Sequence, residues 1–233
     1  MANPEHLSIV TSGPEAFARW REENPDTALD LERADLSNAD LRGCKIRKAD
    51  LRGANLSYAN LFRASLAGAN LIGADLSSAD MGRATLTGAD LSGANLSGAN
   101  LYWADFKRTC LNGTNFSGSR AVRACFLFAD LTGANLSSAT MLEVDLRNTN
   151  LTGARFHAAN MNGADLDRAI MTGADFTKAM IRDSMWTGTD MREANFDQAS
   201  LHRSDLSMAK WDDTTRFPKG FDPLNTGFKD VTE

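Results

Sequence analysis

The sequence predicts an all-β solenoid, and three features of the chain lead to this prediction. Large apolar residues return at every fifth position from Leu31 to Trp211, and Ala stands two positions before most of them. These pentads run without a break through residues 29–213, which leaves no room for a linker. The positions between the two inward residues are mostly polar or Gly, as expected if they face water.

A period of five fits neither a straight helix nor a flat strand. A helix would carry every fifth residue around its whole surface, and a strand would send such residues alternately to opposite faces. Both inward residues stay inside only if the chain turns once per pentad. Glycines such as Gly53, Gly73, Gly93 and Gly113 suit type II turns, which need a positive φ. Four turns would close a coil of 20 residues, and residues 29–213 would form about nine coils with a filled interior.

The repeated motif A-(D/N)-L-x-x, as in the stretch Gly88–Phe106, resembles that of the pentapeptide-repeat family. The resemblance covers about four fifths of the chain. It implies the fold of that family, a right-handed quadrilateral β-helix. It also implies one possible function, because some members are dimeric DNA mimics that bind DNA gyrase and protect it from quinolones.

The chain is predicted to divide into an N-terminal helical cap (1–28), the repeat (29–213) and an irregular C-terminal cap and tail (214–233). A solenoid needs caps because its ends expose backbone and core. Residues Lys229 to Glu233 are expected to be disordered. The aromatic and aliphatic residues expected to cover the first coil are Leu7, Val10, Phe17 and Trp20, and those expected over the last coil are Trp211, Phe217, Phe221 and Phe228.

Composition points to a reduced cytoplasmic protein, and the resemblance of both end segments to those of bacterial members of the family implies a bacterial one. The three cysteines stand at unrelated spacings, which predicts neither a disulfide framework nor a zinc site. No apolar run approaches the ~18 residues of a membrane span, and the first residues lack a signal-peptide pattern. The net charge of -5 argues against direct nucleic-acid binding.

Outward residues sort into four sides, because residues 20 apart should stack. The first and second sides repeat Gly and Ser, whereas the third and fourth carry most of the large apolar side chains. Pentads of the third and fourth sides hold 14 Lys and Arg against 9 Asp and Glu, and the other two sides hold 6 against 13. Exposed apolar residues with nearby Arg are typical of interfaces. The predicted partner surface comprises Phe62, Arg63, Arg83, Tyr102, Trp103, Val122, Arg123, Leu127, Phe128 and Leu142.

Two occupants explain this surface equally well: another protein, or a second copy of the chain. Chance decoration explains it less well, and the chain's own C-terminal tail is a further possible cover. Ala121 is the one small residue in the series of large apolar residues and lies in the same zone, so a local distortion of the coil is expected there.

No catalytic, cofactor or metal site is predicted. A rod without insertions should have no cleft, and a solvated surface role is expected for each of His6, His157 and His202. Asp and Asn alternate freely before the inward residues, which a catalytic or metal site would not tolerate. The expected function is therefore that of a non-enzymatic binding or scaffold protein.

Two alternatives remain. The first is a DNA-mimicking modulator of DNA gyrase or topoisomerase, and the second is a purely structural spacer. DNA mimicry needs a dense row of negative charge, since duplex DNA carries one charge per ~1.7 Å. The first side has such a row only in part, with Asp30, Asp50, Asp90, Asp130 and Asp190 interrupted by Asn70, Cys110, Asn150 and Ile170.

Overall fold

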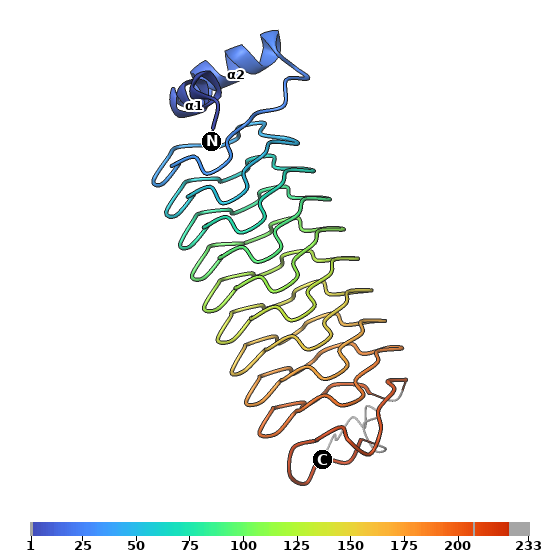
Figure 1. Ribbon diagram of the computed structural model, residues 1–233. Helices are drawn as coiled ribbons and strands as arrows, with labels where there is room; N and C mark the ends of the chain where they lie inside the picture. Colours follow the sequence, from blue (N-terminus) through green and yellow to red (C-terminus); the bar gives the residue numbers. More distant parts are fainter. Residues whose placement is uncertain (1, 207, 224–233) are drawn as a thin grey trace.

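The chain forms a stack of coils with a pair of short helices at its N-terminal end (Figure 1). The structure is a computed structural model and describes residues 2–206 and 208–223. Helix α1 (Pro4–Thr11) and helix α2 (Pro14–Glu23) pack together over the first coil. Within these described ranges, neither helix has the length or the hydropathy needed to cross a membrane.

Parallel bridges join residues one coil apart and hold the stack together. They begin at the pair Asp30–Asp50 and continue on all four sides, as in the pair Asp90–Cys110. Each side contributes a single bridge position per coil, so the described residues form isolated bridges and no longer strand. The 20-residue repeat of these bridges and the turn in each pentad confirm the predicted solenoid.

The same backbone hydrogen bonds repeat in most pentads. The Leu91 N–H donates to the carbonyl of Cys110 in the next coil (2.8 Å), and the Gly93 N–H donates to that of Asn112 (2.8 Å). The Ala94 N–H closes the turn by donating to the Leu91 carbonyl (2.9 Å). Since most of these bonds join neighbouring coils, the stability of the stack depends on contacts between adjacent coils.

The Asp or Asn before each inward apolar residue shapes the following turn. Its Oδ1 accepts a hydrogen bond from the backbone N–H two residues later, as at Asp90 (2.9 Å to Ser92 N) and Asn95 (3.2 Å to Ser97 N). Both residue types offer the same oxygen, which explains why they alternate freely. Asn also links coils, because the Asn95 amide donates to Asp75 Oδ1 (3.0 Å).

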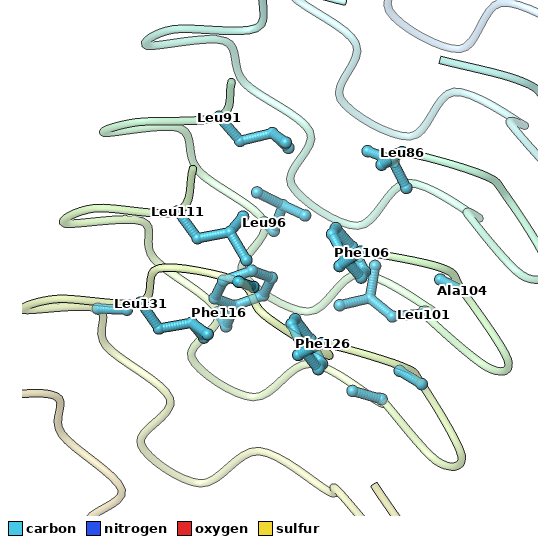
Figure 2. Close-up of a cluster of buried hydrophobic side chains, with 14 of the residues drawn as sticks. Leu86, Leu91, Leu96, Leu101, Ala104, Phe106, Leu111, Phe116, Phe126 and Leu131 are labelled. Atoms are coloured by element: carbon cyan, nitrogen blue, oxygen red, sulfur yellow. The ribbon is translucent and has the colours of Figure 1, made fainter. Parts of the chain in front are cut away.

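Side chains fill the interior of the stack. Leu91, Leu111 and Leu131 are fully buried and form one column through successive coils (Figure 2). Burial of each such side chain contributes about 1.5–3 kcal/mol. The residues two positions earlier, Ala89, Thr109 and Ala129, are small and also buried, and their size lets the four sides approach.

The predicted distortion at Ala121 is wrong. The Ala121 N–H donates to the Thr140 carbonyl at 2.7 Å, as at the equivalent position of other coils. Phe116 and Phe126 lie in the same coil, with ring centroids 5.9 Å apart, and Phe126 stacks on Phe106 at 4.8 Å. Figure 2 shows these rings together in the interior. Ala121 stands between Phe116 and Phe126 in the series of inward residues, so we infer that the two large rings compensate for its small size.

The N-terminal helices supply partners for the open edge of the first coil. The Asp30 N–H donates to His6 Nδ1 (3.0 Å), and the Asp30 carbonyl accepts from the Asn3 N–H (3.1 Å). Helix α1 thus replaces a preceding coil at this position. The prediction of a solvated surface role for His6 is wrong, because the ring is half-buried and caps the ladder.

The expected plug over the first coil is present. Val10 and Phe17 are fully buried, and Leu7 and Trp20 are half-buried against the same core. Gly13 separates the two helices with a φ of 96°, which favours glycine at this point.

At the C-terminal end the ladder continues beyond residue 213, where the repeat was predicted to end. The last bridge joins Asn195 to Arg216, which is one residue out of the regular spacing. Phe217 consequently stacks on Phe196 (6.0 Å) and extends an interior column of rings.

Two further aromatic residues contact Phe217. Phe221 stacks on it at 5.5 Å, and Trp211 meets it edge-on at 5.8 Å. Phe228 and the tail from Lys229 to Glu233, for which disorder was expected, lie outside the described residues.

Candidate protein-binding surface

The three most exposed apolar residues of the predicted partner surface are aromatic and lie on turns of the third and fourth sides. Tyr102, Trp103 and Phe128 are 41%, 50% and 51% exposed. We call these three residues the aromatic patch. Tyr102 and Trp103 occupy one third-side turn, with ring centroids 6.3 Å apart, and Phe128 occupies a fourth-side turn in the next coil.

Two members of the aromatic patch have an unfavourable backbone conformation. The second central residue of each turn has a positive φ, which is the type II pattern expected where Gly stands, as at Gly93 (66°). Trp103 and Phe128 occupy this same position with φ values of 57° and 61°. The left-handed conformation costs a residue with a Cβ about 1–2 kcal/mol. Bulky rings at these turns therefore do not stabilise the backbone.

We expect Trp103→Gly to leave the free energy of unfolding unchanged or to raise it by up to about 1 kcal/mol. Relief of the left-handed backbone should outweigh the ring contacts, which are worth about 0.5–1 kcal/mol at exposed sites. Urea denaturation followed by circular dichroism measures the change. Tyr102→Gly is the matched control, because Tyr102 shares the turn without a positive φ. It should lower stability by about 0.5–1 kcal/mol. Equal losses in both variants would contradict the strain argument.

Arginine side chains lie over the exposed rings. The Arg123 guanidinium is 5.7 Å from the centroid of the Trp103 ring, and that of Arg108 is 5.4 Å from the Phe128 ring. In each pair, the arginine and the ring belong to neighbouring coils and lie on the same side of the stack. Such contacts orient the rings while leaving much of their surface open to solvent.

Charge on these two sides is only partly neutralised. Arg123 is paired with Glu143 (2.7 Å), whose hydrogen bond and charge raise the pKa of that guanidinium. No carboxylate of the described residues lies within 4.0 Å of the guanidinium groups of Arg63, Arg83 or Arg108. These free cations all lie in or beside coils that carry exposed rings. The surface would therefore favour acidic groups on a partner.

The remaining apolar members of the predicted surface are less accessible. Phe62 is half-buried because its ring lies over Gly82, where an added Cβ would stand 3.1 Å from the ring. The Arg63 guanidinium also lies over this ring, 5.2 Å from its centroid. The other three are also half-buried: Val122, Leu127 and Leu142.

Sequence reasoning missed a second group of exposed apolar residues. Ile170, Met180 and Met185 are 48%, 38% and 51% exposed. They stand at the Asp/Asn position, where an apolar side chain cannot make the hydrogen bond to the turn. An apolar residue in place of Asp or Asn was the feature of the sequence that could have identified this group.

The expectation of a rod without any cleft is wrong at one place. A groove of about 580 Å³ lies between α2 and the first coil, outside the filled interior. His157 and His202 are exposed, as predicted. In the ranges that the structure describes, no three His, Cys, Asp or Glu side chains gather where they could hold a metal ion.

The pentads agree with a known family. A sequence profile for pentapeptide repeats matches this chain in eight copies between residues 27 and 210. The chain is a pentapeptide-repeat protein. Among curated proteins, none matches the sequence.

Solved structures of other pentapeptide-repeat proteins resemble this one. HetL from the cyanobacterium Nostoc sp. strain PCC 7120, involved in heterocyst differentiation regulation, is 30% identical. That match covers 82% of this chain and 92% of HetL, with a TM-score of 0.51. A trypsin-treated variant of QnrB1, a plasmid-mediated fluoroquinolone resistance protein, is 18% identical over 73% of this chain and 90% of its own, with a TM-score of 0.52. The second likeness concerns the fold alone.

Proposed function

We propose that this pentapeptide-repeat protein is a non-enzymatic binding or scaffold protein whose working surface is the aromatic patch and the arginines around it. One observation carries the proposal. Trp103 and Phe128 are large and exposed at turn positions where a bulky side chain is unfavourable, and an arginine of a neighbouring coil lies over each ring. Tyr58, which stands at the same kind of turn position on the second side, has no such arginine among the described residues. Neither core packing nor turn geometry accounts for Trp103 and Phe128, whereas contact with a partner does.

The partner is another protein, and a second copy of this chain is the alternative. The free cations Arg63, Arg83 and Arg108 favour a partner surface with carboxylates facing them. The proposal includes a cytoplasmic location, where the free cysteines remain reduced. It also includes the right-handed quadrilateral β-helix of the family and the division at residue 28 as the finer description of the chain.

A binding comparison with surface variants tests the proposal. The chain, tagged and immobilised, is used to capture proteins from a lysate of its source organism, and the captured proteins are quantified by mass spectrometry. The triple variant Tyr102→Ser, Trp103→Ser and Phe128→Ser should lose a specific partner by tenfold or more, because central aromatic residues carry much of an interface's free energy. Its circular dichroism should stay unchanged.

A matched triple variant provides the control. Tyr58→Ser, Ile72→Ser and Ile170→Ser remove three exposed apolar side chains from the first and second sides and should retain the partner. Sedimentation of wild type and both triples then separates a second copy from a foreign partner. Equal loss of partner in both triples, or unfolding of the first one, would refute the assignment of this surface.

Little in the charge pattern favours the gyrase alternative. On the first side, Asp50 and Asp190 are each paired with an arginine, Arg52 and Arg192, at 2.6 Å. These pairs weaken a row of negative charge that is already interrupted. A supercoiling assay in which the chain inhibits gyrase or protects it from a quinolone would nevertheless favour this alternative over the proposal.

A further inference from the structure

The groove at the N-terminal end lies between helix α2 and the first coil of the stack. Helix α2 contributes Phe17, Ala18 and Arg21, and the first coil contributes Lys45 and Lys48. Its volume of about 580 Å³ lies within the range of small-molecule pockets, about 300–1,000 Å³. None of these residues belongs to the surface proposed above.

Arg21 gives this groove a buried positive charge without a matching carboxylate. Only 8% of the residue is exposed, and its Nη1 donates to the carbonyls of Asn24 (3.0 Å) and Thr27 (2.7 Å). Its Nε and Nη2 have no hydrogen-bond partner. The guanidinium lies over the rings of Phe17 (5.4 Å) and Trp20 (4.9 Å).

Buried charges in proteins are normally paired, and that of Arg21 is balanced only by carbonyl dipoles and ring faces. Burial lowers the pKa of Arg21, but a guanidinium keeps its proton at neutral pH. Among the described residues, no carboxylate lies within 4.0 Å of it. An anion in the groove would supply the missing negative charge.

The open side of the groove adds further positive charge. Lys45, Arg47 and Lys48 are exposed on the coil wall, and Arg47 donates to Ser65 Oγ (3.1 Å). The acidic lining residues are Glu22 and Asp26, both exposed. The lining therefore includes four cationic side chains and two carboxylates, which gives the groove a net positive charge.

We infer that this groove binds a small organic carboxylate with an apolar tail. The tail would contact the apolar lining residues Pro14, Ala18 and Pro25, and the carboxylate would lie toward Lys45 and Lys48, within the field of Arg21. Binding is non-covalent. The nearby Cys44 thiol is buried, and burial together with the charge of Asp40 raises its pKa to about 11, so it stays protonated.

Calorimetric titration of the full chain with octanoate tests this inference. Octanoate should bind with a dissociation constant of about 1 mM or below, which is the range expected for a ligand of its size. Acetate, which has the charge without the tail, and 1-octanol, which has the tail without the charge, should each bind at least tenfold more weakly.

Variants locate the site. Lys45→Gln with Lys48→Gln should weaken octanoate binding about tenfold or more. The matched double variant Lys178→Gln and Lys210→Gln removes the same charge from the far end of the stack and should not change it. Ala18→Trp places a large side chain in the groove from an exposed helix position and should abolish binding.

Three results would overturn the inference. These are no octanoate binding by the wild type, equal weakening by the two double variants, and 1-octanol binding as tightly as octanoate. The inference is independent of the partner surface, because the triple variant of the aromatic patch should bind octanoate as the wild type does.

Discussion

Replacing Phe126 with alanine is expected to lower the free energy of unfolding by about 3–5 kcal/mol. The Phe126 ring is fully buried, stacks on Phe106 at 4.8 Å and meets Phe116 edge-on at 5.9 Å. Its removal leaves a cavity in a coil where one of the four positions usually held by a large apolar residue is already Ala121. Urea denaturation followed by circular dichroism, with the shift in midpoint as the readout, measures the loss.

Phe128→Ala is the control for this experiment. Phe128 stands two residues along the chain, is 51% exposed and contributes no ring to the interior. Its replacement should change the free energy of unfolding by no more than about 0.5 kcal/mol. Similar losses for the two variants would mean that the inward and outward positions have been assigned wrongly.

Ala121→Leu is expected to lower the free energy of unfolding by about 1–3 kcal/mol, although it restores the residue most common at this position of the repeat. Ala121 stands between the buried Phe116 and Phe126 in the same coil, so we expect a leucine there to overpack the interior. Thermal and urea denaturation measure the effect.

Met81→Leu is the matched control, because Met81 is the equivalent inward residue of the same side two coils earlier. This change conserves volume and also moves toward the common residue, so it should cost less than about 1.5 kcal/mol. A stabilised Ala121→Leu variant would contradict the view that neighbouring rings fill the site.

The fold could be predicted because its information is local and repeated. One turn per pentad follows from where Leu and Ala stand in each five-residue unit, and the bridges between residues 20 apart agree with it. Ala121 shows the limit of this reasoning. The small size of Ala121 alone predicted a distortion. The packing also depends on the large rings of Phe116 and Phe126, and the repeat pattern does not weigh the volume of one inward residue against that of its neighbours.

The candidate surface was only partly predictable. The sequence located Tyr102, Trp103 and Phe128 on outward positions, which they occupy. It did not separate exposed from half-buried members, because Phe62 is covered through its contact with Gly82 one coil away. The cleft beside Arg21 was missed because it is formed by two segments with no shared pattern.

The sequence by itself determined the family, the five-residue spacing of turns and which residues point inward, since each pentad specifies its own turn and its own buried side chains. Only the tertiary structure decided how helix α1 satisfies the backbone of Asp30, which arginines lack a carboxylate and where a groove opens. Those features depend on distances between residues in different coils or at the ends of the stack. The repeat determines the average environment of each position in a pentad. The residues that stack on that position from neighbouring coils determine how tightly it packs, how exposed it is and which charges surround it.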